Sequence, residues 1–266
     1  MISMPLFKRS MKAVIKILIL FITILAMYSI IIIWMFDPDL AQMLDQYQQV
    51  MPGMMSAVGM VGDTSSLIGF INTYLYGFIM LIIPMIFEVM IVNSLVMKYI
   101  DNGSLACILA TPNSRKKIIT TQIIAIILSV FLLIAVTTII GYVSAEIMFK
   151  GELNVAKYIN LNISTFLLHI VVSGIAFLAA CLFNEEKSYL ALGAGLPIAF
   201  YLIQMLSNMG DSLEKLKYLT LYTLLPSSNI VAGDGGVLEA NLILIVMAIA
   251  LYTVGFIRFI KKDLPL

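Results

Sequence analysis

The chain has 266 residues, of which 61% are hydrophobic and 12% charged, with a net charge of +1 and a mean hydropathy of +1.04. Soluble globular domains are about 45–50% apolar and about 25% charged. A water-soluble core of this size cannot bury so much apolar surface, so the composition excludes a soluble globular protein and predicts an integral membrane protein.

The first apolar run covers residues 17–36 and follows four basic residues. It is longer than the core of a secretory signal, and no small-x-small cleavage pattern follows it, so we expect an uncleaved first span. Residues 1–14 mix apolar and basic side chains, which predicts a short amphipathic helix in the inner interface before the chain turns into the bilayer. A basic flank of the first span is the alternative interpretation.

Six segments reach the length of about 20 residues that a helix needs to cross a bilayer. They lie near residues 15–36, 70–97, 117–145, 161–183, 189–207 and 241–260. Backbone polar groups in lipid must be satisfied within the segment, which leaves helices as the plausible form. The predicted fold class is an all-α membrane protein with six transmembrane helices, in which residues 1–266 form one transmembrane domain.

The basic residues predict the orientation of these spans. With both termini in the cytoplasm, twelve of the sixteen lysine and arginine residues fall inside: Lys8, Arg9, Lys12, Lys16, Lys98, Arg115, Lys116, Lys117, Lys187, Arg258, Lys261 and Lys262. This bias follows the positive-inside rule. The chain also has 13 lysines and 3 arginines, a composition that fits a bacterial AT-rich genome. We expect a multi-pass protein of the bacterial cell membrane.

Two longer segments are expected on the outer side, at residues 37–69 and 208–240. Both combine residues at helical spacing with breaks at Gly and Pro. They either cap the outer mouth of a translocation path or simply connect spans.

The inner loop between the second and third spans has a pattern of its own. Asn102 and Gly103 break the second span, and Ser104 can cap a helix whose apolar residues share one face. Those residues are Leu105, Ile108 and Leu109. Pro112 ends this helix, because the residue before a proline leaves the α region. The pattern predicts two or three helical turns parallel to the membrane, and an ordinary amphipathic connector fits it equally well.

Residues 103–115, G-S-L-A-C-I-L-A-T-P-N-S-R, resemble the segment G-T/S-L-x-x-L-L-x-T/S-P-x-S-R of permease subunits in the type-two ABC export family. Asp101 stands where that family usually has a glutamate. The run at 258–264 resembles the family's closing F-x-x-R/K-D-L, and the six spans, the basic N-terminal helix and the cytoplasmic termini also match. The resemblance covers the whole chain in layout and about 20 residues in motif.

The resemblance implies that the loop helix is a coupling helix, which docks on an ABC ATPase subunit. Two permease subunits, identical or different, would assemble with two ATPases. The sequence has no G-x-x-x-x-G-K-[S/T] phosphate loop, so ATP and Mg²⁺ are expected on the partner chain, and this chain is expected to be no enzyme and to hold no cofactor. Leu105, Ile108 and Leu109 would fill a groove in that partner, with Asp101 and Arg115 at its rim and Gly103 and Pro112 bounding the helix.

Glu88 and His169 are ionisable residues within the predicted spans. A charge at bilayer depth costs at least about 2.5–3.5 kcal/mol, so Glu88 should be paired, protonated, or face protein or water. It is either a relay between the coupling helix and the translocation path or a structural hydrogen-bonding residue. A single histidine makes no metal site, and we expect His169 to be packed and hydrogen-bonded.

Together these features predict the permease subunit of an exporter for an amphipathic solute such as a drug, a peptide or a lipid. Its expected partners are ATPase subunits, a second permease and the lipid bilayer, and nothing predicts a nucleic-acid partner. Two alternatives stay open. One is a secondary transporter driven by protons or sodium through Glu88, and the other is a membrane scaffold or immunity protein that transports nothing.

Overall fold

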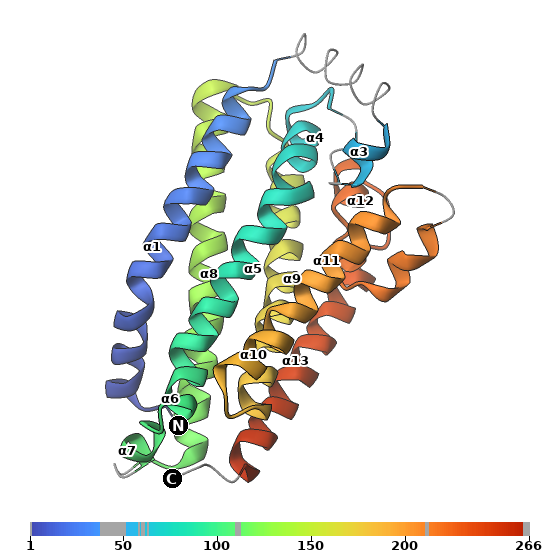
Figure 1. The fold of residues 1–266 in the computed structure, drawn as a ribbon. Coiled ribbons are helices and arrows are strands. Elements are labelled where there is room, and N and C mark those ends of the chain that lie inside the picture. The colour runs from blue at the N-terminus through green and yellow to red at the C-terminus, as the bar shows by residue number, and fades with distance from the viewer. Residues whose placement is uncertain are drawn as a thin grey trace.

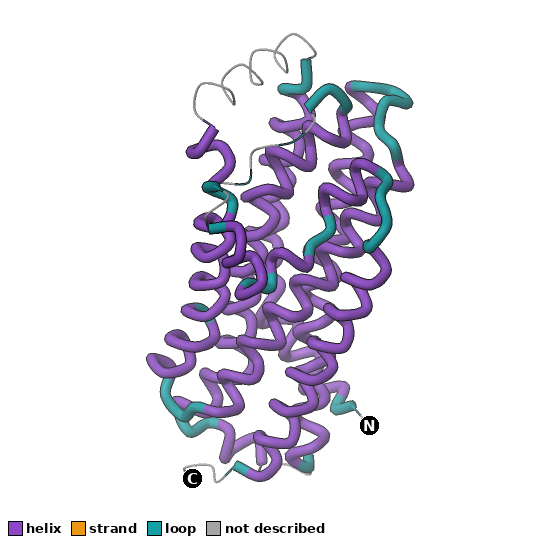
Figure 2. Tube along the Cα trace, turned by 90° about the vertical axis from the view of Figure 1, so that its right-hand side faces the viewer, coloured by secondary structure: helices purple, strands orange, loops and turns teal. Residues whose placement is uncertain are grey.

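The computed structural model describes residues 2–37, 52–57, 59, 62, 64–109, 113–210 and 213–262. All regular structure in these ranges is helical, and they contain six helical segments long and apolar enough to cross a membrane. The segments are Met4–Trp34, Leu67–Asp101, Arg115–Met148, Val155–Leu182, Glu186–Ser207 and Val237–Lys261. They run side by side as an elongated bundle (Figures 1 and 2). The predicted all-α fold with six candidate spans is confirmed.

Four spans are single helices: α1 (Met4–Trp34), α8 (Arg115–Met148), α9 (Val155–Leu182) and α13 (Val237–Lys261). The fifth span joins α10 (Glu186–Gly193) to α11 (Gly195–Ser207). The second span is composite: α4 (Leu67–Ile71), the π-helix η1 (Asn72–Ile79), α5 (Met80–Val92), the π-helix η2 (Asn93–Met97) and α6 (Lys98–Asp101). π-Helical segments within α-helices are rare and are frequently found at functional sites.

Five short helices lie between the spans: α3 (Pro52–Ala57), α7 (Leu105–Leu109), the 3₁₀ turns η3 (Glu214–Leu219) and η4 (Tyr222–Leu224), and α12 (Ser227–Ala232). Helix α7, the start of α1 and the end of α13 lie at one end of the bundle, and α3, α4 and α12 lie toward the other (Figure 1). Most of the expected outer segment at 37–69 lies outside the described residues.

The N-terminal helix differs from the expectation. One continuous helix of 31 residues runs from Met4 to Trp34, without the turn expected after residue 14. Leu6, Ser10, Val14 and Leu18 are all buried, so a stripe at four-residue spacing continues from the basic segment into the first span. The Ser10 hydroxyl also donates to Gln122 Oε1 in α8 at 2.8 Å. The same packing face on both halves explains why no separate helix forms.

Helix α9 is the centre of the bundle, since 78% of its most apolar stretch is buried. It packs closely against α13 through small residues. A Cβ atom at Gly255 would lie 2.7 Å from the Phe177 ring, and one at Gly174 would lie 3.2 Å from Leu251. Small residues let helices in a membrane approach closely, where no hydrophobic force draws them together.

Candidate functional site

Glu88 of α5 and His169 of α9 form a pair in the middle of the bundle. The distance from His169 Nδ1 to Glu88 Oε1 is 2.9 Å, and neither side chain is exposed. The sequence predicted that Glu88 would be paired or protonated and that His169 would be hydrogen-bonded, and the structure brings the two residues together. Both residues lie deep in the protein, away from the surface that would face lipid.

A proline in α5 determines how His169 is held. His169 Nε2 lies 2.7 Å from the Met80 carbonyl oxygen. In a regular α-helix this carbonyl would accept from the backbone N–H four residues later, but that residue is Pro84, which has none. The imidazole therefore supplies the donor that the proline removes. Because a carbonyl only accepts, Nε2 carries a hydrogen.

This geometry fixes the number of protons in the Glu88–His169 pair. With Nε2 protonated, a short Nδ1–Oε1 contact needs one more proton between these two atoms. The proton resides either on the carboxyl group, next to a neutral imidazole, or on Nδ1, next to a carboxylate. Both forms have zero net charge, which limits the cost of burying the pair at bilayer depth.

Two further polar contacts lie one helical turn away from this pair. Ser173, one turn beyond His169, lies 2.9 Å from the Tyr252 hydroxyl of α13. Ser173 also donates to the Ile170 carbonyl at 3.0 Å, so Tyr252 is the donor to Ser173. On the other side, the Tyr222 hydroxyl lies 3.4 Å from the sulfur of Met85, one turn before Glu88. The helices that carry the pair thus contact α13 and η4 one turn away from it.

The inner loop contains the expected helix in a shorter form. Helix α7 covers five residues, Leu105–Leu109, rather than two or three turns. Gly103 has a φ of +68°, a left-handed conformation that ends α6 and that other residues adopt only with strain. Just before α7, Asn102 Oδ1 accepts from the Ser104 backbone N–H at 3.0 Å and from the Ser104 hydroxyl at 2.6 Å. Ser114 caps α8 as expected, accepting from the Lys117 N–H at 3.2 Å.

The apolar face of α7 points toward its own chain. Leu105 is only 5% exposed, and Ile108 is partly buried against the same core. Both line a small gap with Leu95, Ile118 and Phe259. The expectation that Leu105 fills a groove in a partner is therefore wrong for this conformation, because hydrophobic burial attaches α7 to the bundle. The Leu109 side chain and Pro112 lie outside the described residues.

The two charged residues that flank α7 also have partners within the chain. Asp101 Oδ1 accepts from the Glu186 backbone N–H at 3.1 Å, at the first residue of α10. Arg115 Nη1 donates to the Lys262 carbonyl at 2.8 Å, just beyond the end of α13. Both are favourable helix-end contacts, an anion at an N-terminus and a cation at a C-terminus. Asp101 and Arg115 thus connect helices of this chain, in addition to any contact with a partner.

A third contact completes this end of the bundle. Lys262 Nζ donates to the Phe183 carbonyl, at the C-terminal end of α9. Burial lowers the pKa of Lys262. The chain of contacts from Arg115 through Lys262 to Phe183 joins the ends of α8, α13 and α9.

We expect the Arg115→Ala variant to lose about 1–2 kcal/mol of stability, because the carbonyls at the end of α13 lose a charged donor. The measurement is thermal unfolding of the purified protein in detergent. Lys116→Ala is the matched control, since Lys116 is exposed and should change stability by less than about 0.5 kcal/mol. Equal stability of the two variants would contradict the assigned role of Arg115.

Sequence reasoning missed several of these residues. Met80 and Tyr252 were not singled out, although a proline four residues after Met80 in an apolar span is a sign of a free carbonyl. Lys262 was read only as part of the closing basic run. Among the described residues, no group of three or more His, Cys, Asp or Glu side chains could hold a metal ion.

The comparisons with known proteins define the family. A family model described as "Protein of unknown function (DUF2705)" matches residues 40–265. The match covers most of the sequence, so the chain belongs to this family. No curated protein matches the chain.

Proposed function

We propose that this chain is the membrane-spanning permease subunit of an ATP-driven exporter, coupled through α7 to separate ATPase subunits that bind ATP and Mg²⁺. The supporting observation is the attachment of α7 to the bundle. Leu105 anchors it in the core, Asp101 bonds to the start of α10, and Arg115 bonds to the end of α13. A push on α7 would therefore reach several spans together.

This attachment suits a mechanical input better than a simple connector. A connector needs only to span the distance between two helices, whereas Leu105 of α7 is buried in the core and the flanking residues Asp101 and Arg115 bond to other spans. In the proposed cycle, ATP binding closes the ATPases, which push α7 and shift the spans from an inward-open to an outward-open state. We place α7 and both termini in the cytoplasm of a bacterial cell, on the basis of the positive-inside bias. A second permease, identical or different, would complete the path.

The experiment is co-purification of the protein from its own membranes, followed by identification of bound chains. An ABC ATPase should accompany the wild type. Ala106→Arg, at a half-exposed position of α7, should reduce its recovery at least about tenfold, because a buried, unpaired charge at an interface costs several kcal/mol.

Ala156→Arg is the matched control. It makes the same change at an exposed position in the first turn of α9, at the opposite end of the bundle, and should leave the ATPase bound. An ATPase that stays bound in Ala106→Arg would place the docking surface elsewhere. A wild type that binds no ATPase would contradict the proposed function.

A second candidate function rests on the Glu88–His169 pair. A buried pair that shares one proton is a suitable element for proton-coupled transport, as expected for a secondary transporter. This candidate predicts transport into sealed vesicles that is driven by a proton gradient without ATP and is lost in Glu88→Gln. The exporter predicts the opposite dependence on ATP.

A further inference from the structure

The end of the bundle opposite to α7 contains a polar cavity of about 420 Å³, within the size range of pockets for small ligands. It lies between η1, α11, η4 and α12, with α3 at its edge. Its polar lining comes mainly from Gln204, Asn208, Tyr222, Thr223, Ser227 and Ser228. The lining thus consists of amides and hydroxyls, with the rings of Tyr76 and Tyr222 among them.

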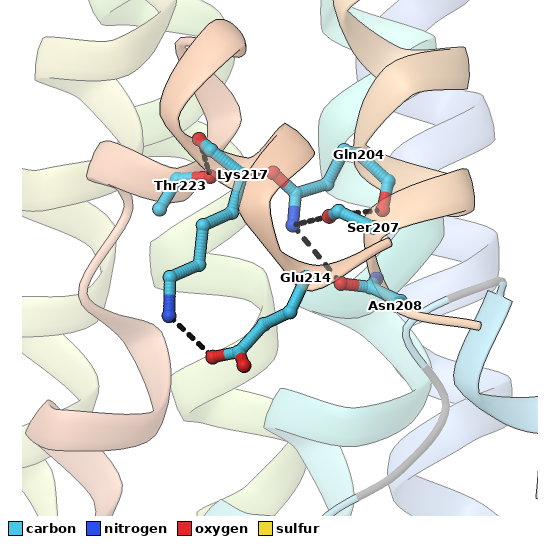
Figure 3. Close-up of polar contacts among 6 residues, drawn as sticks. All are labelled: Gln204, Ser207, Asn208, Glu214, Lys217 and Thr223. Atoms are coloured by element: carbon cyan, nitrogen blue, oxygen red, sulfur yellow. Dashed lines mark hydrogen bonds and ion pairs between the residues drawn. The ribbon is translucent and has the colours of Figure 1, made fainter. Parts of the chain in front are cut away.

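The amides on one wall of the cavity are fixed in position. The Gln204 side-chain amide lies 2.8 Å from the Thr223 hydroxyl and 3.0 Å from the Asn208 side-chain amide (Figure 3). The Thr223 hydroxyl also donates its hydrogen to the Lys217 carbonyl at 2.7 Å. These bonds connect α11 to the segment before α12. Within the described residues, one end of the Asn208 amide and the Ser227 hydroxyl have no hydrogen-bond partner. Oriented polar groups without a protein partner are available to a ligand.

No charged residue lines this cavity among the residues that the structure describes. The nearest charges in Figure 3 are Glu214 and Lys217, which bond to each other at 2.6 Å. The Lys217 ammonium lowers the pKa of the Glu214 carboxyl, and both remain charged and mutually neutralised. Another cation, Lys157, donates to the Val231 carbonyl. Among the described residues that line the cavity, an anionic headgroup would therefore find no positive charge.

We propose that this cavity binds an uncharged group rich in hydrogen-bond donors and acceptors, such as a sugar ring or a peptide amide, on the amphipathic solute. That the bound group belongs to a transported solute rests on the proposed function. The binding itself needs no ATPase. Amides and hydroxyls match the polar edge of such a group, and tyrosine rings match its less polar face.

The position of the cavity connects it to the Glu88–His169 pair. Leu81 lines the cavity, Met85 contacts Tyr222 of the cavity wall, and Glu88 follows on the same face of α5 at helical spacing. An occupant that shifts Tyr222 or α5 would thus act on the helix that holds the buried pair.

The experiment uses the purified protein in phosphatidylcholine nanodiscs, without ATP or ATPase. A photoreactive derivative of n-octyl glucoside serves as the probe, and labelled peptides are identified by mass spectrometry. Labelling should fall on residues of α11, η4 and α12. Unlabelled n-octyl glucoside or N-octanoyl-Gly-Gly amide should compete with the probe for labelling. The more potent competitor shows whether the cavity prefers a sugar ring or a peptide amide. n-Octyl phosphate should compete at least tenfold less well.

Asn208→Leu should weaken probe binding about tenfold, because it removes the free end of the Asn208 amide and the hydrogen-bond partner of Gln204. Asn160→Leu, at an exposed position of α9, is the matched control and should bind normally. If Asn208→Leu does not fold, Ser227→Ala with Ser228→Ala provides the same test by removing two hydroxyls. Labelling outside the cavity, equal competition by the phosphate, or unchanged binding in the cavity variants would overturn the proposal. Failure of ATPase co-purification would overturn only the exporter.

Discussion

His169→Leu should destabilise the protein by about 3–5 kcal/mol, the cost of removing one partner from a buried, hydrogen-bonded pair. The variant leaves two groups without partners at once. Glu88 loses its contact at 2.9 Å, and the Met80 carbonyl loses the donor that replaces the missing N–H of Pro84. Each unsatisfied buried group costs about 1–3 kcal/mol or more. The measurement is thermal or denaturant unfolding in detergent, with helical content as the signal.

Glu88→Gln is the matched variant for this test. A glutamine amide can donate to His169 Nδ1 without any charge, so the variant should keep its stability within about 1 kcal/mol of the wild type. Glu88→Leu combined with His169→Leu should recover part of the loss at the Glu88 position, but the Met80 carbonyl should stay unsatisfied. Wild-type stability of His169→Leu would contradict the structural role derived for the pair.

Leu105→Asp should detach α7 from the bundle, at a local cost of about 3 kcal/mol or more. Leu105 is 5% exposed in a gap lined by apolar side chains such as Leu95 and Phe259, and a carboxylate there has no cation to pair with among the residues that line the gap. Helix α7 is short and lies in the loop between the second and third spans. The loop should therefore open without unfolding the bundle. Limited proteolysis of vesicles with the α7 side exposed should then cut within residues 102–114 much faster than in the wild type.

Leu105→Met is the control, since it preserves volume and apolar character and should stay protected. If α7 is the mechanical input that we propose, Leu105→Asp should also abolish ATP-driven transport while the remaining spans stay folded. Unchanged protease resistance in Leu105→Asp would show that burial of Leu105 does not hold α7 in place.

The sequence was sufficient to predict features that depend on local composition. Apolar runs located six spans, because a bilayer requires about 20 apolar residues whatever their order. Gly103 and Ser114 marked helix ends correctly, because a left-handed glycine and a capping serine act within a few residues. The prediction of a separate helix at residues 1–14 was wrong. These residues pack against α8 on the same face as the first span, and the sequence does not show this contact.

Contacts between helices that are distant in the chain could not be predicted from the sequence. Glu88 and His169 were each recognised as unusual, but nothing in the sequence shows that α5 and α9 place them 2.9 Å apart. The direction of Leu105 was wrong because an amphipathic helix has the same pattern whether its apolar face meets a partner or its own bundle. The bond from Arg115 to the Lys262 carbonyl was not predicted, because its acceptor is a backbone group that no residue pattern reveals.

Pro84 has a consequence for how this bundle finds its correct alignment. Lipid chains and leucine side chains are chemically alike, so apolar faces of membrane helices discriminate poorly between neighbouring registers. The absent amide hydrogen at Pro84 creates one acceptor on α5 that only a donor at the right height can satisfy, and His169 is at that height on α9. A residue usually regarded as a helix breaker thereby specifies where two otherwise interchangeable surfaces meet.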